Sequence, residues 1–198
     1  MADTKISIED IKKLKELSGA GLTDAKQALV EAKGDFDKAL EAMRKKGLTK
    51  AEKRGDRETR EGLVEAYIHD GRLGAIVEVN CETSFVAKTD EFKTLAHQIA
   101  MQVASMNPLY VSEDDIPEDV RKAKIKELEA NFKGPENMKE KILEGQMKKS
   151  FSDKVLLNQP YILDDTKTVE QFVKEAIAKT GENITIRQFK RIELGVTE

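Results

Sequence analysis

The chain has 198 residues, which is long enough for one large domain or two modest ones with a real hydrophobic core. Its formal net charge of −3 excludes a strongly basic molecule that binds nucleic acid over its whole surface. No apolar run approaches the ~20 residues that span a bilayer, the first ten residues lack the layout of a signal peptide, and one cysteine cannot form an internal disulfide, so we expect a cytoplasmic protein that does not bind membranes.

Residues 1–48 predict a module of three short helices. Apolar side chains recur at helical spacing in three segments: Ile8, Ile11, Leu14 and Leu17; Ala25, Ala28, Leu29 and Ala32; Phe36, Ala39, Leu40 and Met43. Ser7 with Asp10 fits a capping box, Thr23 and Asp35 are the expected caps of the second and third helices, and Gly47 is the expected end of the third. So small a core suggests that the module leans on a partner or on the rest of the chain.

The stretch Gly19-Ala20-Gly21 separates the first two of these helices. It superficially resembles a phosphate-binding loop, but it does not follow a strand, and no Gly-Lys-Ser/Thr comes after it. A tight turn between helices, which glycine permits, explains it better.

Residues 49–60 predict a basic linker between the module and the rest of the chain. The segment from Arg44 to Arg60 contains eight basic and three acidic residues. It is either a nucleic-acid-binding arm or a solvated linker. We favour the linker because no aromatic residue interleaves with the charges to stack bases.

Residues 61–198 predict an α+β core. Asp70-Gly71 is a strong hairpin signal because a type I′ turn needs positive φ, and it separates two alternating strands, 63–69 and 73–80. On the second strand one face is apolar: Ala75, Val77, Val79 and Cys81.

Helices and one more strand follow the hairpin. Thr89 is expected to open a helix with a single apolar stripe: Phe92, Leu95, Ala96, Ile99, Val103 and Met106. Segment 112–150 is highly charged and predicts two helices separated by Gly134-Pro135, and Gln159-Pro160 predicts a loop. Apolar residues at helical spacing over 169–177 predict another helix, which Gly181 stops. A strand over 184–194 is expected to complete an antiparallel sheet on which the helices pack.

Catalytic chemistry has little support. A nucleophilic Cys81 would need a base within reach, and the chain offers only His69 and His97. No spaced set of Cys, His or Asp suggests a metal site. We therefore interpret Cys81 as core, and expect a binding protein that is not an enzyme and needs no metal and no cofactor.

Phe85 lies on the turn between the second strand and the following helix. Its spacing favours an ordinary core role, in which the ring plugs the corner between the two elements. The alternative is an aromatic side chain held at the tip of a rigid turn, ready to enter a pocket on another protein, as interface hot spots do.

Two long segments resemble the bacterial elongation factor Ts family. One is KLKELSGAGLTDAKQALVEAKGDFDKALEAMRKKG, Lys13 to Gly47, which is similar to the family's ubiquitin-associated-type N-terminal module. The other is VEVNCETSFVAKTDEF, which is similar to its Thr-Asp-Phe-Val signature, and a closing Gly-Glu-Asn-Ile at Gly181–Ile184 also matches. The resemblance covers essentially the whole chain.

The resemblance implies a guanine-nucleotide exchange factor for elongation factor Tu, the GTPase that carries aminoacyl-tRNA to the ribosome. It implies that the N-terminal module grips the nucleotide domain of that GTPase and that Phe85 enters the same domain to disturb its Mg²⁺ and phosphate site. The residues implied at the first contact, or beneath it, are Leu14, Lys15, Gly19, Ala20, Gly21, Leu22 and Thr23. Those implied at the wedge are Thr83, Ser84, Phe85 and Val86.

This chain departs from the family pattern in two ways. Ser84 stands where the family usually has Asp, so it can keep a capping role but not the carboxylate. The chain also resembles a short form with one core subdomain, which suggests that a homodimer supplies the second half. The competing hypotheses are an adaptor whose three-helix module binds other proteins without affecting nucleotide, and an RNA-binding protein that uses Arg44–Arg60. The net charge makes the second the weaker one, and we expect no direct binding to nucleic acid.

Overall fold

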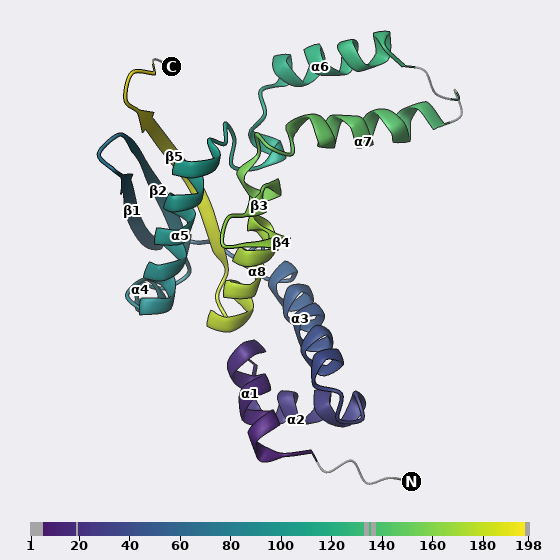
Figure 1. Ribbon diagram of the computed structural model, residues 1–198, viewed down its shortest axis with the longest axis vertical. Coiled ribbons are helices and arrows are strands. Elements are labelled where there is room, and N and C mark those ends of the chain that lie inside the picture. The colour runs from purple at the N-terminus through teal and green to yellow at the C-terminus, as the bar shows by residue number, and fades with distance from the viewer. Residues whose placement is uncertain (1–5, 19, 133–134, 136–137, 197–198) are drawn as a thin grey trace. The chain divides into compact units, whose positions relative to one another are not determined.

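The computed structural model describes residues 6–18, 20–132, 135 and 138–196, and has the predicted α+β fold (Figure 1). Its helices are α1 (Ile8–Ser18), α2 (Leu22–Glu31), α3 (Phe36–Glu52), α4 (Ser84–Ala87), α5 (Asp90–Met106), α6 (Glu118–Ala130), α7 (Lys139–Phe151) and α8 (Val169–Thr180). Short 3₁₀ turns are η1 (Glu113–Asp115) and η3 (Leu156–Asn158). Across the part of the chain that is described, no helix is both long and apolar enough to cross a membrane.

The strands form two sheets. The main sheet has the order β1-β2-β5, built from β1 (Glu61–His69), β2 (Leu73–Cys81) and β5 (Ile184–Glu193). The small second sheet pairs β3 (Pro160–Tyr161) with β4 (Asp164–Thr168), antiparallel. The sequence did not predict this second sheet, because Gln159-Pro160 was expected to lie in a loop.

The chain divides into two compact units. The first contains Met1–Val64, Glu78–Ala96 and Gln171–Ile186, and the second contains Glu65–Val77, His97–Glu170 and Arg187–Glu198. The predicted domain limits at residues 48 and 60 stay predictions.

In the first unit, α1, α2 and α3 surround a small apolar core. Its buried members are Ile11, Leu14, Ala25, Ala28, Leu29, Ala39 and Met43. The backbone N–H of Asp10 donates to Ser7 Oγ (2.9 Å), and that of Lys38 donates to the Asp35 side chain (3.1 Å), so two predicted caps are confirmed. The predicted cap at Thr23 is wrong, because α2 already begins at Leu22 with Gly21 as its N-cap.

Two further expectations for this module fail. The predicted apolar stripe of α1 is buried only in its middle, at Ile11 and Leu14, while Ile8 and Leu17 at its ends are mostly exposed. Gly47 does not end α3, which continues to Glu52. A Cβ at this position would lie 3.1 Å from the Cβ of Ala178 on α8, so the glycine permits a close approach between helices rather than a stop.

The hairpin prediction is confirmed. Asp70 and Gly71 have φ of 50° and 64°, and β1 and β2 flank them. Residues 75, 77, 79 and 81 of β2 are buried, as the alternation required. Gly62 on β1 lies against β2 so closely that a Cβ there would be 2.2 Å from the Val79 carbonyl oxygen.

In the second unit, α5 is held by contacts that the hydrophobic pattern did not indicate. Gln102 is fully buried; its Nε2 donates to Gln159 Oε1 (3.1 Å), and its Oε1 accepts from the N–H of Ile162 (2.8 Å). Met106, predicted as the end of the apolar stripe, is 42% exposed. Asn107, with φ of 47°, follows the last residue of the helix.

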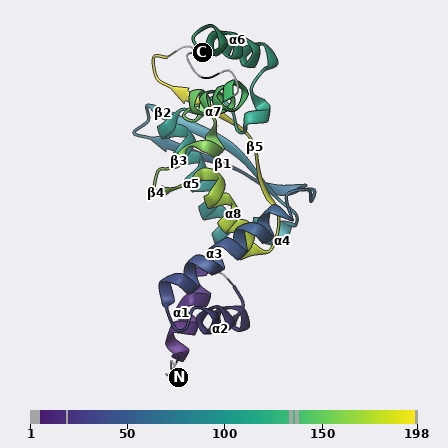
Figure 2. The same cartoon turned by 90° about the vertical axis from the view of Figure 1, so that its right-hand side faces the viewer.

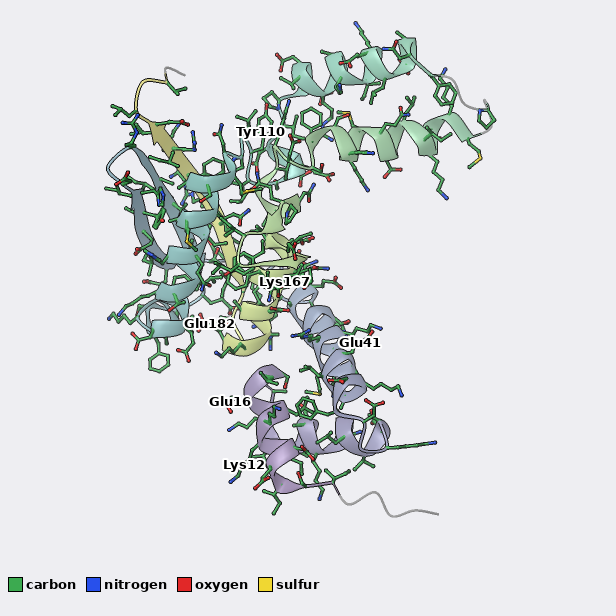
Figure 3. All side chains as sticks on the ribbon, in the orientation of Figure 1. Lys12, Glu16, Glu41, Tyr110, Lys167 and Glu182 are labelled. Atoms are coloured by element: carbon green, nitrogen blue, oxygen red, sulfur yellow. The ribbon has the colours of Figure 1, made fainter. Side chains whose placement is uncertain are left out.

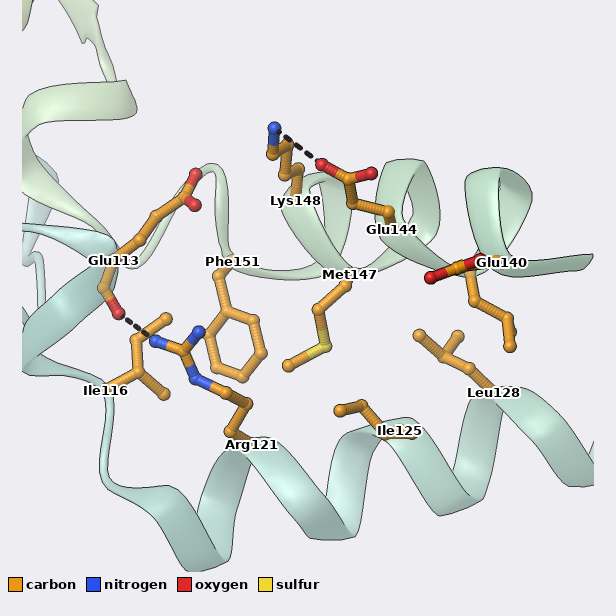
Figure 4. Close-up of a pocket in the computed structure, with 11 residues that line it drawn as sticks. Glu113, Ile116, Arg121, Ile125, Leu128, Glu140, Glu144, Met147, Lys148 and Phe151 are labelled. Atoms are coloured by element: carbon orange, nitrogen blue, oxygen red, sulfur yellow. Dashed lines mark hydrogen bonds and ion pairs between the residues drawn. The ribbon is translucent and has the colours of Figure 1, made fainter.

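The charged segment forms the expected pair of helices, α6 and α7, which lie side by side in both views (Figures 1 and 2). Gly134 of the predicted break lies outside the described residues. An apolar cavity of about 420 Å³ lies between the two helices and is closed at its base by Ile116 and Phe151 (Figure 4). The Phe151 ring also packs edge-on against Tyr110, with centroids 6.5 Å apart.

Candidate functional site

Phe85 lies on α4, a single turn of helix between β2 and α5. Its side chain is 80% exposed, whereas the next two residues, Val86 and Ala87, are buried. The core role that spacing favoured for Phe85 is therefore wrong. Burial of its two neighbours fixes the backbone of the turn while the ring itself points into solvent.

Thr83, the residue before α4, is anchored by the carboxylate of Glu182. Glu182 lies in the turn after α8 (Figure 3), and its Oε2 accepts from the N–H groups of Glu82 (3.1 Å) and Thr83 (3.0 Å). The Thr83 hydroxyl donates to Glu182 Oε1 (2.6 Å) and also accepts from the N–H of Val86 (3.4 Å), which makes Thr83 the N-cap of α4.

Glu182 was not identified from the sequence as a site residue. It belongs to the quoted Gly-Glu-Asn-Ile segment, but a carboxylate about a hundred positions from its partners gives no local signal. Ser84, by contrast, is exposed and does not cap the turn, because Thr83 already does.

The predicted residues of the N-terminal module surround the turn between α1 and α2. Leu14 is fully buried beneath this turn, and its carbonyl accepts from the Ser18 hydroxyl (2.6 Å). Leu22 is exposed, and Leu17, the last member of the predicted apolar stripe of α1, is also exposed just before the turn.

The other predicted residues of this surface lie as follows. Lys15, Gly21 and Thr23 are exposed, and Ala20 is half-buried. Gly19 lies outside the described residues. A binding surface at this turn would therefore present Leu17 and Leu22 as its large apolar side chains.

Cys81 is core, as the parity of β2 predicted. Its side chain is fully buried and its thiol donates to the Thr83 carbonyl (3.2 Å). Burial raises the pKa of the thiol, and the nearby Glu182 carboxylate raises it further, so the nucleophilic thiolate is disfavoured.

The two histidines lie in the second unit, beside Tyr67. His97 Nδ1 is 3.0 Å from Glu65 Oε1, and His69 Nδ1 is 3.0 Å from the Tyr67 hydroxyl. Among the residues that the structure describes, no group of three or more Cys, His, Asp and Glu side chains is placed to hold a metal ion.

Basic residues after α3 are engaged within the first unit. Arg54 Nη1 donates to the Ile177 carbonyl (3.4 Å), and Arg57 Nη1 lies 3.4 Å from Glu82 Oε1. These contacts use part of the predicted basic linker to hold the chain against α8 and β2.

Comparison with known proteins gives the family. A family model described as Elongation factor TS matches residues 4–196. A protein named Elongation factor Ts from Thermotoga sp. strain RQ2 is 51% identical, and the match covers 96% of this chain and 97% of that relative. A protein of the same name from Moorella thermoacetica is 49% identical, and the match covers 96% of both chains. Because the family model and these relatives match nearly the whole chain, this chain belongs to the elongation factor Ts family of translation elongation factors.

Proposed function

We propose that this protein binds elongation factor Tu and promotes the release of GDP by inserting Phe85 into the nucleotide domain of that GTPase. The observation that carries the proposal is the 80% exposure of an aromatic ring on a turn whose backbone is anchored on both sides. Leaving the apolar area of an aromatic ring in water is unfavourable in free energy, and a partner that covers the ring recovers this free energy. Such residues contribute much of the binding free energy at interfaces.

The physical route to nucleotide release runs through the metal site of the partner. Mg²⁺ requires near-ideal octahedral geometry, so a ring that displaces one ligand weakens the hold on the phosphates. The factor must bind the nucleotide-free GTPase more tightly than the GDP form. By linkage, GDP weakens binding of the factor by the same ratio, which allows turnover.

The N-terminal module supplies the second proposed contact. Leu22 and Leu17 are the exposed apolar anchors, Lys15, Ala20, Gly21 and Thr23 surround them, and the buried Leu14 supports the turn from beneath. Gly19 belongs to the same proposed contact by resemblance. Because this module has a small core, contact with a partner also stabilises it.

We propose that the protein acts by binding and carries out no covalent step of its own. The buried, protonated thiol of Cys81 supports this. Engagement of Arg54 and Arg57 inside the first unit supports the expectation that nucleic acid is not the direct partner.

The test is stopped-flow release of a fluorescent GDP from elongation factor Tu, with wild type and Phe85→Ala. We expect Phe85→Ala to slow release by roughly thirtyfold, as the loss of a hot spot of about 2 kcal/mol would. Leu163→Ala, at an exposed apolar position in the turn between β3 and β4, is the control and should promote GDP release at the wild-type rate. If a folded Phe85→Ala protein promoted GDP release as fast as wild type, the proposed insertion of Phe85 would be refuted. Complex formation by wild type without faster release would instead favour the adaptor.

We also propose that the protein forms a homodimer through the open face of its main sheet. Within the second unit, Ile68, Ile76 and Ile192 are 72%, 52% and 75% exposed, and Ile76 alternates with the buried Ala75 and Val77. Ile76 therefore faces away from the covered side of the sheet. Two identical apolar faces can cover each other about a twofold axis, which removes both from water.

A further inference from the structure

Glu82 and Glu182 each hold the backbone of the other's segment. Glu182 accepts from the N–H groups of Glu82 and Thr83, while Glu82 Oε1 accepts from the N–H of Asn183 (2.6 Å). We call this reciprocal pair of contacts the carboxylate latch. It joins the end of β2 to the start of β5, segments about a hundred residues apart in the chain.

The latch rests on a fixed base. Asn183 is 2% exposed, and its Nδ2 donates to the carbonyls of Arg57 (2.7 Å) and Gly55 (3.2 Å). Gly181, with φ of 80°, ends α8 and turns the chain so that Glu182 points back at Thr83. The carboxylate is therefore placed by residues on three separate segments.

The position of Phe85 depends on this anchor. The ring is largely exposed, so packing does not fix it, and a four-residue helix is too short to be stable by itself. What fixes the turn is Thr83 on one side and the buried Val86 and Ala87 on the other. Thr83, in turn, is bound through both its N–H and its hydroxyl by Glu182.

We propose that Glu182 is a positioning residue for nucleotide exchange, which preorganises the Phe85 turn before the partner is met; this rests on the function proposed above. A turn that is already ordered loses less conformational entropy on binding, and a wedge acts only if it enters at the correct place. Glutamine at position 182 keeps the size of the side chain but has one acceptor oxygen in place of two. It cannot accept from both the backbone N–H groups and the Thr83 hydroxyl at the observed geometry.

The decisive experiment is a double-mutant cycle of Glu182→Gln and Phe85→Ala in the GDP-release assay, with the half-saturating concentration and maximal rate measured separately. We expect Glu182→Gln to slow exchange by about tenfold, below the ~10²-fold that a 1 Å misplacement can cost. In the Phe85→Ala background the same substitution should change the rate by less than about twofold, because both changes remove one effect. Glu58→Gln, at an exposed carboxylate paired with Arg60, is the matched control.

A purely structural role predicts a different result. It would lower the rate by the same factor in both backgrounds, in step with a loss of folded protein measured by circular dichroism, and that outcome would overturn the proposal. So would an unchanged rate for Glu182→Gln alone.

Hydrogen exchange of the free protein separates this proposal from the proposed function. Glu182→Gln should speed exchange at the amides of Glu82 and Thr83 while leaving the amide of Val77, inside β2, at the wild-type rate. Unchanged exchange at residues 82 and 83 would overturn the latch itself. If amide exchange at residues 82 and 83 is faster in Glu182→Gln but the wild-type protein does not accelerate GDP release from the GTPase, the exchange function and the positioning role are both overturned. The latch then remains as a structural contact.

Discussion

At the scale of single residues, the site is defined by a contrast between exposed and anchored groups. Phe85 is exposed, while Thr83 immediately before its turn is held by two hydrogen bonds to the Glu182 carboxylate. Spacing alone favoured a buried Phe85, because a periodicity argument asks only whether a residue continues a stripe. The spacing of apolar residues does not reveal that Phe85 lies on a separate one-turn helix, α4, which ends before α5 begins.

Glu82 gives the latch a pH dependence. The hydrogen bond from the N–H of Asn183, and then the charge of Arg57, hold the pKa of Glu82 below its usual value. A carboxyl whose pKa is lower in the folded than in the unfolded protein stabilises the fold above its unfolded pKa, and this contribution is lost as the pH falls through the folded pKa. Glu82→Gln should therefore be less stable than wild type at pH 7, and the difference should shrink below pH 4.5, the ordinary value of this group.

Urea unfolding of both proteins between pH 7 and pH 3, followed by circular dichroism, measures that difference. A gap between the two midpoints that stays constant over the whole range would contradict the prediction.

At the scale of elements, the hairpin of α6 and α7 is held mainly at its base. α6 has no buried residue among those described, and Phe151 is the buried residue of α7. It packs in one cluster with Ile116 and Val155, where the two helices join the rest of the unit. The charged composition of 112–150 predicted the helices, but not which end would be packed.

Phe151→Ala should therefore destabilise the protein by about 3–5 kcal/mol, the usual loss for a buried phenylalanine. Ile125→Ala, on the wall of the same cavity but 38% exposed, should cost clearly less because it leaves a site that was already partly in water. Urea midpoints of the two variants provide the comparison, and equal losses would show that the hairpin is packed along its whole length.

At the scale of the whole molecule, the open sheet face predicts a dimer. Light scattering at working concentration should give twice the mass of one chain for wild type and the mass of one chain for Ile76→Lys. A lysine on that face is solvated in the monomer but is buried against its own copy in the dimer. Val30→Lys, at an exposed position on α2, controls for adding a charge and should stay dimeric. A monomeric wild type would refute the homodimer.

The sequence by itself determined the class of elements, most of their limits, the parity that buries Cys81, and the family. Each of these follows from short-range information: a period of two or near four, a turn residue with positive φ, or a long run of matched residues. What only the tertiary structure decided is how far each face is covered and what reaches it from elsewhere. Leu17 and Met106 continue apolar stripes yet lie exposed, while Gln102 is buried because Gln159 and Ile162 satisfy its amide. Glu182 finds Thr83 only after the chain folds, since hydrogen bonds between distant segments leave no period in the sequence.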